Sequence, residues 1–491
     1  MLAPRMVAAA IALAALVAGC AGSSSGADPA PATSAGSGTT APPTAAKPRP
    51  ARSAGADWPV FGRVPARTSA SASSQGLRTG TLPRLRRIHV DVPGTVDSTP
   101  IYLAGVRVAG ARRDVFVATT TYGRTFALDA GSGRLLWTFT PRGIGGWAGT
   151  AQITNASPAA DPSRRWVFTA SPDGLVHRLA LRNGRESAGG RWPVRVTLDP
   201  THEKLTSSFN VSGPLLIVAT GGYIGDAPPY QGHVVTIDRA SGRIRAVFNT
   251  LCANRHRIIR PSTCPASDSA IWARSGVTVE PGTGNLLLAT GNGPYDGRTD
   301  FGDSVVRLTP TASRLLGHWT PTNQRELDQT DTDLGSTGPI VAGRVVVQSG
   351  KDARIHVLTR GLRLVQDLPT PGGAGMFTAP AVWSHAGATT VFATTAGGTA
   401  AYAVRGRRLH RLWQNGTAGT SPVVVGGLLL VQDPNGGLVV SRAATGQQLA
   451  RLSTGAAHWQ SPVPGGGRIL VAEGNANDHR TSGTVTLFVP G

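Results

Sequence analysis

The sequence predicts an all-β fold, namely an eight-bladed β-propeller of four-stranded antiparallel blades whose ring is closed by an N-terminal strand. The first observation behind this prediction is a hairpin of two short strands with alternating apolar residues, clearest at residues 121–139 and repeated along the chain. The second is that a repeat opens with a small residue, followed in most copies by proline, and continues with a short apolar run before the hairpin. Successive repeats are about 40 residues apart where no loop is inserted. Four short strands per repeat are typical of a propeller blade.

The hairpin at 121–139 is built around a turn at residues 129–133, DAGSG. In such a turn Asp129 can bond the backbone two residues on, and glycine supplies a positive φ. Weaker copies of the hairpin lie at residues 236–248, 305–319, 401–413 and 439–452. One supersecondary unit used many times indicates a repeat architecture.

The N-terminal residues predict export. Residues 1–19 carry Arg5 and an apolar run too short for a membrane span, and small residues stand directly before Cys20, as in a lipoprotein signal peptide. An ordinary signal peptide with a chance cysteine is the alternative. Residues 20–56 would then be the lipidated Cys20 and a disordered Ser/Gly/Ala/Pro tether, because they have almost no large apolar side chain to bury. We therefore expect an extracytoplasmic protein anchored to the bacterial cell membrane by an N-terminal lipid.

Residues 57–491 are expected to form the propeller. The repeats open at residues 99, 157, 207, 275, 338, 379, 421 and 461, which gives eight blades. Nearly continuous apolar runs follow each opening, such as LLIVAT at 215, and predict strands buried between neighbouring blades. The last repeat is one strand short. Residues 82–92 (LPRLRRIHVDV) are predicted to supply the missing strand, so that both ends of the chain meet in the eighth blade.

The formal net charge is +21 and comes almost wholly from arginine, since lysine occurs only at Lys47, Lys204 and Lys351. One interpretation is an anionic partner, such as lipid headgroups, a phosphate-rich wall polymer or nucleic acid. The alternative, which we favour because the arginines are scattered along the chain, is a GC-rich genome that encodes its cations as arginine. Nucleic acid is therefore not expected as a partner, whereas an envelope protein or an anionic wall or lipid polymer stays open.

Two cysteines, Cys252 and Cys264, remain after Cys20. In an exported protein we expect them to form a disulfide. The sequence has no Cys/His spacing of a metal site, no G-x-S-x-G, no Walker loop and no HExxH. Hydrolase and nucleotide-binding functions therefore lack support.

Residues 57–62 (DWPVFG), the following Arg67-Thr68 and the hairpin ALDAGSGRLLW resemble the pyrroloquinoline-quinone-type repeat propellers of the quinoprotein alcohol dehydrogenase-like superfamily. The resemblance covers the chain from about Asp57 onward. It implies that the hairpin tryptophans Trp137, Trp319 and Trp413 dock onto the next blade. That family contains quinone-dependent alcohol dehydrogenases and also non-catalytic envelope assembly lipoproteins, so the repeat specifies the fold more strongly than the function.

The same resemblance implies a set of candidate site residues. Asn292 matches a calcium-ligand asparagine, and Trp272 lies about two residues from the position of a tryptophan stacked beneath the quinone. Asp331 or Asp333 would be the general base that acts on the alcohol. An alternative is a wider cation site on one rim of the propeller. We favour a different interpretation, in which its members lie in two solvated loops and their acids stabilise turns. These residues are Asn292, Asp296, Asp300, Asp303, Glu326, Asp328, Asp331 and Asp333.

Three departures from the enzymes count against catalysis. Residues 221–226 read GGYIGD, with Asp226 in place of the expected ligand glutamate; no vicinal cysteine pair is present; and no CxxCH motif occurs to attach haem. We therefore expect a monomeric, non-catalytic binding or scaffold protein of the cell envelope without a cofactor. The alternative is an alcohol or sugar dehydrogenase that depends on pyrroloquinoline quinone (PQQ) and Ca²⁺.

Overall fold

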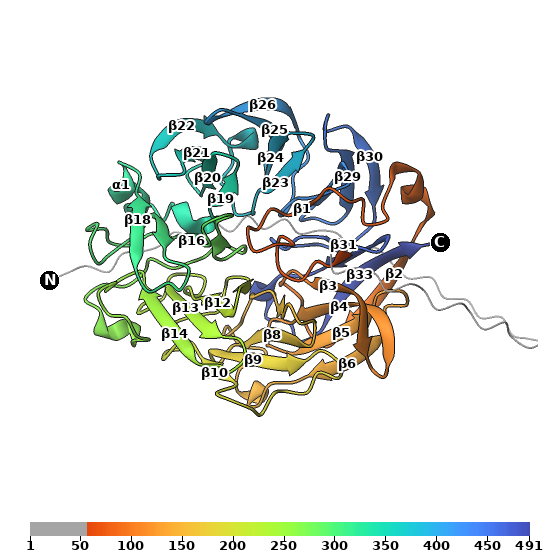
Figure 1. Cartoon of the computed structure of the whole chain (residues 1–491), viewed down its shortest axis with the longest axis horizontal. Coiled ribbons are helices and arrows are strands. Elements are labelled where there is room, and N and C mark those ends of the chain that lie inside the picture. The colour runs from red at the N-terminus through yellow and green to blue at the C-terminus, as the bar shows by residue number, and fades with distance from the viewer. Residues whose placement is uncertain (1–55) are drawn as a thin grey trace, which may run out of the picture. The chain divides into compact units, whose positions relative to one another are not determined.

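The computed structural model describes residues 56–491, whose strands form eight sheets around one axis (Figure 1). Seven sheets have four strands and one has five, and in each blade consecutive strands pair antiparallel. The predicted eight-bladed β-propeller is therefore confirmed. The predictions for residues 1–19, for Cys20 and for the tether before residue 56 concern residues outside the described part of the chain.

The first four blades follow one another along the chain. Blade 1 contains β3 (Ile101–Val108), β4 (Ala111–Thr119), β5 (Thr125–Asp129) and β6 (Leu135–Phe139). Blade 2 contains β7 (Ala159–Ala160), β8 (Trp166–Ser171), β9 (Leu175–Ala180) and β10 (Val194–Arg195). Blade 3 contains β11 (Asn210–Ser212), β12 (Leu215–Ala219), β13 (His233–Asp238) and β14 (Ile244–Asn249). Blade 4 contains β15 (Thr278–Val279), β16 (Leu286–Ala289), β17 (Val305–Leu308) and β18 (Leu315–Trp319).

The remaining four blades complete the ring. Blade 5 contains β19 (Ile340–Ala342), β20 (Val345–Ser349), β21 (Arg354–Thr359) and β22 (Leu364–Pro369). Blade 6 contains β23 (Ala381–His385), β24 (Ala388–Thr395), β25 (Gly398–Arg405) and β26 (Arg408–Asn415). Blade 7 contains β27 (Val423–Val425), β28 (Leu428–Gln432), β29 (Leu438–Arg442), β30 (Gln448–Leu452) and, as its fifth strand, β1 (Ala70–Ser71). Blade 8 contains β31 (Val463–Gly465), β32 (Arg468–Ala472), β33 (Gly483–Pro490) and β2 (Leu85–Val92).

The helices are short connections between strands. The only α-helix among the described residues is α1 (Gln324–Gln329), and the 3₁₀ turns are η2 (Thr79–Arg84), η3 (Ile144–Gly146), η4 (Pro261–Thr263), η5 (Leu334–Ser336), η6 (Pro371–Gly373) and η7 (Ala476–Asp478). A helix with the length and apolar character needed to cross a bilayer does not occur in residues 56–491.

The second strand of each blade lies between neighbouring blades, which explains its apolar sequence. All five residues of β12 are buried, as are all five of β20 and of β28. The outermost strands alternate instead: β22 is only partly buried along its length. Apolar residues are needed on both faces of an inner strand and on one face of an outer strand.

The ring closes as predicted, with an N-terminal strand in the last blade. β2 pairs antiparallel with β33, from Leu85 opposite Pro490 to Val92 opposite Gly483. An N-terminal and the C-terminal strand therefore meet in blade 8, and the closed ring has no open edge between its first and last repeats.

The residues before β2 have a role that the repeat pattern does not predict. Backbone bonds join Trp58 to Tyr102 of β3, Ala160 of β7 to Pro59, and Val382 of β23 to Thr68. β1 then pairs parallel with β27. These partners belong to the first strands of blades on different sides of the axis. Residues 57–71 therefore cross the middle of the ring (Figure 1).

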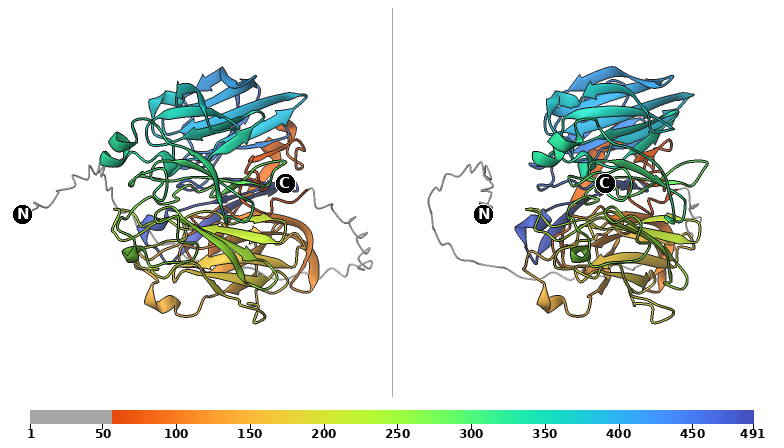
Figure 2. Two further views of the ribbon diagram at one scale, coloured as in Figure 1. Left: turned by 60° about the vertical axis from the view of Figure 1, so that its left-hand side comes forward. Right: turned by 90° about the vertical axis from the view of Figure 1, so that its left-hand side faces the viewer.

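The two ends of the ring differ in the kind of connection they carry (Figure 2). In blades 1–7 the first and third connections between strands lie at one end, which we call the turn face, and the β31–β32 turn of blade 8 lies there as well. The loop that enters the blade and the loop between its second and third strands lie at the other end, the loop face. This division follows from the antiparallel order that all eight sheets share.

The arginines that are scattered in the sequence gather on the turn face. Every blade has at least one exposed arginine in or beside its turns there, and none of them makes an ion pair with a described residue: Arg84, Arg107, Arg112, Arg134, Arg165, Arg182, Arg185, Arg243, Arg314, Arg344, Arg363, Arg405, Arg407, Arg408 and Arg442. The acids in and beside the same turns are held by other arginines, or by a histidine in the case of Glu186: Asp57, Asp114, Asp129, Asp161, Glu186, Asp238 and Glu280.

Candidate functional site

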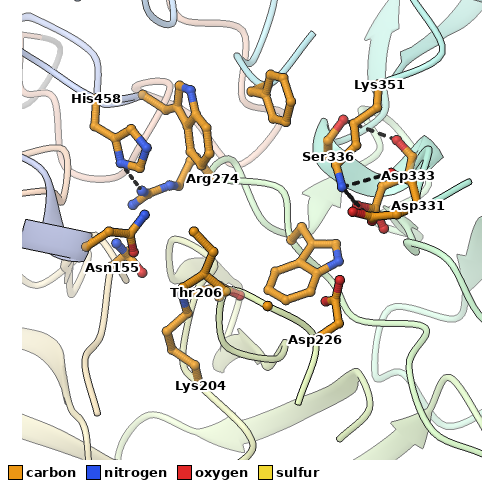
Figure 3. A pocket seen from close by; sticks show the side chains of 16 residues that line it. Asn155, Lys204, Thr206, Asp226, Arg274, Asp331, Asp333, Ser336, Lys351 and His458 are labelled. Carbon is orange, nitrogen blue, oxygen red and sulfur yellow. Dashed lines mark hydrogen bonds and ion pairs between the residues drawn. The ribbon is translucent and has the colours of Figure 1, made fainter. Parts of the chain in front are cut away.

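A pocket lies at the centre of the loop face, where the entry loops of several blades meet (Figure 3). Its volume is about 180 Å³, and it combines aromatic, cationic and acidic side chains. Its lining residues are Asn155, Lys204, Thr206, Ile224, Gly225, Asp226, Trp272, Arg274, Asp331, Asp333, Ser336, Lys351, Phe377, His458, Trp459 and Asn477. Most of them stand just before the first strand of a blade, because the entry loops converge on the axis.

One wall of the pocket is organised around the buried carboxylate of Asp97. Its Oδ2 accepts hydrogen bonds from Arg274 at 3.0 Å and from Asn155 Nδ2 at 2.9 Å, and His458 Nδ1 lies 2.9 Å away. Burial disfavours the charged form, but Arg274 and His458 outweigh it and hold the pKa of Asp97 well below its usual range. Asp97 does not line the pocket, but it fixes three polar side chains along this wall. Figure 3 shows these three, Asn155, Arg274 and His458.

Lys204 is a second cation on the pocket wall. It is only 7% exposed, and its ammonium lies 5.5 Å from the centre of the Tyr223 ring. Burial and then repulsion by Arg274 lower the pKa of Lys204 to about 7. Its charge therefore changes in the neutral pH range.

The opposite wall holds Lys351 between two acids. Lys351 Nζ lies 2.7 Å from Asp331 Oδ1 and 2.5 Å from Asp333 Oδ2. Burial alone would lower the pKa of Lys351, but the two carboxylates raise it above its ordinary value. Asp333 is 3% exposed, and burial raises its pKa although Lys351 works against this. The side chain of Asp331 is 58% exposed.

Asn292 contacts this acidic wall through a hydrogen bond to Asp333. Its backbone N–H donates to Asp333 Oδ1 at 2.8 Å, while its own side-chain oxygen Oδ1 is buried and has no hydrogen-bond partner in the described chain. A side chain at Gly291 would collide with both Asp333 and Trp272, so glycine is required for these two groups to approach each other. The indole Nε1 of Trp272 is also buried without a partner.

Further carboxylates surround the same region. Asp226 accepts a hydrogen bond from the Tyr230 hydroxyl at 2.8 Å, and burial raises its pKa. Burial also raises the pKa of Asp268, and it raises that of Asp303 to about 8. Asp303 Oδ2 is buried without a partner. Within the described residues no three acids, histidines or cysteines are arranged as a ready metal cage.

The structure brings together some of the residues predicted from sequence and separates others. Trp272, Asp331 and Asp333 line the pocket, and Asn292 reaches it through Asp333. Asp296 instead accepts backbone N–H bonds from Arg298, Thr299 and Asp300, so it closes its own turn. The other members of the wider cation site that do not line the pocket are Asp300, Asp303, Glu326 and Asp328.

The three hairpin tryptophans lie at contacts between blades. Trp137 Nε1 donates to Leu181 O at 2.8 Å, across the boundary between blades 1 and 2. Trp413 Nε1 donates to Ala443 O at 3.0 Å, across the boundary between blades 6 and 7. The ring of Trp319 packs 5.0 Å from that of His356 in blade 5.

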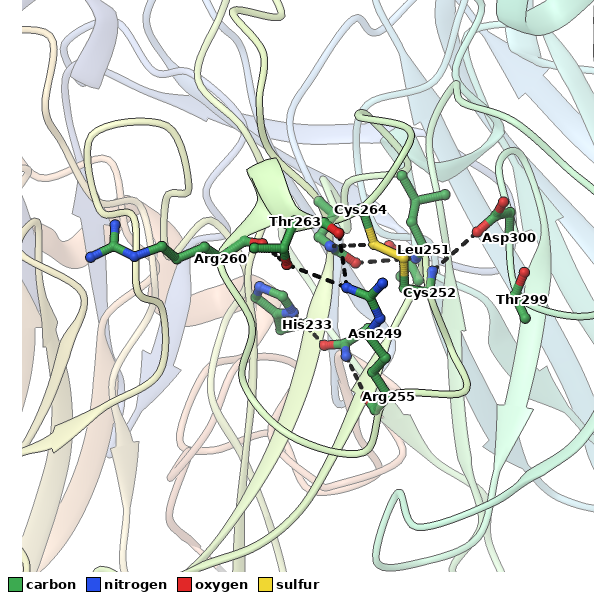
Figure 4. Close-up of a disulfide and its surroundings, with 12 residues drawn as sticks. His233, Asn249, Leu251, Cys252, Arg255, Arg260, Thr263, Cys264, Thr299 and Asp300 are labelled. Carbon is green, nitrogen blue, oxygen red and sulfur yellow. Dashed lines mark hydrogen bonds between the residues drawn. A yellow bond between two sulfur atoms is a disulfide. The ribbon is translucent and has the colours of Figure 1, made fainter.

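Cys252 and Cys264 form the predicted disulfide, with their Cα atoms 6.2 Å apart (Figure 4). The bridge closes a loop between blades 3 and 4, and the N–H of Cys252 donates to Asp300 Oδ1 at 3.0 Å. Neither cysteine lines the pocket. The disulfide therefore stabilises a loop and does not face a ligand there.

The sequence analysis did not identify Lys204, Arg274 or Lys351 as pocket residues. A signal for the two lysines was present, because the chain has only Lys47, Lys204 and Lys351, and both lysines of the described part line the pocket. Arginine and lysine are not interchangeable where a compact charge or a shifted pKa is needed. Lys204 and Lys351 therefore place compact, titratable charges on the pocket wall.

Comparison with known proteins identifies the repeat. A family model described as outer membrane protein assembly factor BamB matches residues 74–256. The dehydrogenase subunit of the quinone alcohol dehydrogenase of Acetobacter aceti is 24% identical over 344 residues, which cover 62% of this chain and 44% of that protein. This chain thus aligns with less than half of the length of that relative.

Solved structures share the fold. A quinohemoprotein alcohol dehydrogenase of Pseudomonas putida HK5 superposes with a TM-score of 0.69 and 15% identity, over 89% of this chain and 80% of that one. A europium-containing methanol dehydrogenase superposes with a TM-score of 0.65 and 14% identity, over 88% of this chain and 98% of that one. At these identities the likeness extends to the fold alone.

These comparisons correct two expectations drawn from the sequence. The expected non-catalytic scaffold protein and the expected absence of a cofactor are both contradicted, because the curated relatives are quinone alcohol dehydrogenases. Asp226, which stands where a ligand glutamate was expected, lines the pocket together with two lysines. The predicted resemblance is thus supported: the described chain is an eight-bladed β-propeller whose repeat is similar to the PQQ-like repeat of the quinoprotein alcohol dehydrogenase-like superfamily.

Proposed function

We propose that this protein is a quinone-dependent alcohol dehydrogenase that holds PQQ and a hard cation in the pocket on the loop face. The observation that carries the proposal is the pocket itself, in which Lys351 bridges Asp331 and Asp333 beside the unpartnered oxygen of Asn292. The identity of the curated relatives supports it.

The pocket fits a planar, aromatic, anionic quinone. Trp272, Phe377 and Trp459 offer aromatic surface, and the rings of Phe377 and Trp459 are stacked 5.1 Å apart. Arg274 and Lys204 offer positive charge for carboxylates. A cofactor of this class would be held by stacking and charge together, as ligands are in other mostly preformed sites.

The acidic wall fits a hard cation. Asn292 Oδ1 and Asp333 are adjacent oxygen donors, and Asp226 is a further carboxylate on the pocket wall. The buried Asn292 oxygen lacks a partner, and the pKa of Asp333 is raised by burial, so bound positive charge would relieve both. Ca²⁺ or a lanthanide ion would suit these donors, and one of the structural relatives contains europium.

A bound quinone would supply the electron acceptor for oxidation of the alcohol carbon. The residues of this chain would orient the alcohol and take its proton. Asp331, whose side chain is the more exposed of the two acids, would accept the hydroxyl proton. Lys351 fixes its position at 2.7 Å, and Asp333 fixes Lys351 in turn. Asp331 has a positive φ of 51°, a strained conformation for a residue other than glycine, which is common at functional positions.

The proposal is tested by reconstituting the purified chain with PQQ and Ca²⁺ and following alcohol-dependent dye reduction. We expect turnover with primary alcohols in the wild type, and loss of at least about 100-fold in Asp331→Asn with cofactor binding retained. Glu326→Gln removes an exposed acid of the same loop outside the pocket and serves as the matched control. Binding of PQQ without turnover for any alcohol or aldose would refute the proposed activity.

We also propose that the protein works as a monomer outside the cytoplasm, anchored by a lipid on Cys20. The support is the sequence of residues 1–20. Metabolic labelling with an alkyne fatty acid should mark the wild type and not Cys20→Ser. Equal labelling of both would remove the support for this anchor.

A further inference from the structure

The turn face carries a ring of unpaired positive charge. Its acids are already held in pairs, whereas its exposed arginines have no ionic partner among residues 56–491. The loop face is different, because its cations stand there beside many acids, among them those of residues 296–303 and 326–333. The charge of the described chain is therefore polarised between the two ends of the ring.

The densest part of the turn face spans three neighbouring blades. Arg405, Arg407 and Arg408 are all exposed around the turn between β25 and β26 in blade 6. Arg442 is exposed at the corresponding turn of blade 7, and Arg84 is exposed at the start of β2 in blade 8. These turns lie at the same end of the ring, so three neighbouring blades present their charges side by side.

The described chain also begins at this face. Asp57 Oδ1 accepts from the N–H of Ala104 in β3, and its Oδ2 lies 2.9 Å from Arg164 Nε in the first turn of blade 2. The described chain therefore enters the ring at its basic end. The pocket opens at the opposite end.

We propose that the basic turn face binds the surface of an anionic phospholipid bilayer, so that the pocket points away from the membrane. A broad array of arginines matches a plane of anionic headgroups, whereas a single polymer chain would be better served by a groove. The lipid proposed on Cys20 favours the membrane over a wall polymer, because stable anchoring by one lipid modification generally needs a second signal such as a basic patch.

The proposal is tested by measuring how the chain partitions between neutral vesicles of phosphatidylcholine and vesicles that also contain phosphatidylglycerol. The full chain is used with Cys20→Ser, so that no acyl group contributes and the ratio of the two affinities reports charge. One variant carries Arg405→Gln, Arg407→Gln and Arg408→Gln. The matched control carries Arg142→Gln, Arg298→Gln and Arg325→Gln, which removes the same charge from exposed residues that lie on the loop face outside the pocket.

Each arginine near an anionic membrane contributes about fivefold to partitioning, so the turn-face variant should lose roughly 100-fold of the preference for anionic vesicles. The control should keep most of it, and added salt should weaken the wild type. Equal losses in both variants, or no preference in the wild type, would overturn the proposal. Binding to soluble polyphosphate without binding to vesicles would overturn it in favour of a wall polymer. Unchanged thermal unfolding of both variants checks that the ring is intact.

Discussion

Lys204 should make the binding of an anionic ligand depend on pH. Burial and Arg274 lower its pKa to about 7. A group with this pKa is roughly 90% protonated at pH 6 and roughly 10% at pH 8. If only the ammonium form contacts a carboxylate of the ligand, affinity should fall about tenfold between these two pH values. A charge-assisted hydrogen bond contributes about 1.5–3 kcal/mol, so Lys204→Met should bind about 10–100-fold more weakly at pH 6.

The assay is a titration with PQQ, followed by quenching of tryptophan fluorescence at pH 6, 7 and 8. Trp272 and Trp459 line the pocket, so their emission reports its occupancy. Arg142→Met, which removes an exposed cation outside the pocket, is the control and should keep the wild-type profile. A pH dependence that persists unchanged in Lys204→Met would assign the titration to another group and refute this reasoning.

Three further predictions concern the framework around the pocket. Asp97→Asn should lower the free energy of unfolding by about 3 kcal/mol in chemical denaturation, because it leaves Arg274 without its buried partner. The control Asp238→Asn breaks an ion pair with a half-exposed arginine and should cost under about 1 kcal/mol. Trp137→Ala removes a large side chain and its hydrogen bond between blades 1 and 2, and should lower the free energy of unfolding by about 3–5 kcal/mol, measured in the same way. Cys252→Ser opens a short loop and should cost about 2–3 kcal/mol relative to the oxidised wild type, with no further change on adding reductant.

Most of the fold could be predicted from the sequence because a propeller repeats a local pattern. The alternation in residues 121–139 predicts a hairpin from side-chain period alone, and eight openings predict eight blades. The strand at β2 was predictable as well, since a repeat that lacks one strand requires a partner and residues 82–92 have the period of a strand. These features depend on neighbours in the sequence or on the closure of a ring.

The segment at residues 57–71 was not predictable in the same way. Its bonds to β3, β7, β23 and β27 join blades that are distant in sequence, and no periodic pattern encodes them. Its partners are set by where the innermost strands lie around the axis. This position exists only once the ring is closed.

The sequence by itself determined the repeat, the number of blades, the pairing of Cys252 with Cys264 and the residue types available for chemistry. Only the tertiary structure decided which of them meet. It places Lys204 and Lys351 on one pocket and sets Asn292 behind Asp333, although these residues come from different blades. It also gathers arginines that are scattered along the chain onto one face. The physical reason is that a propeller sends corresponding loops of every blade to the same end of the ring, so proximity follows the position within a repeat and not the distance along the chain.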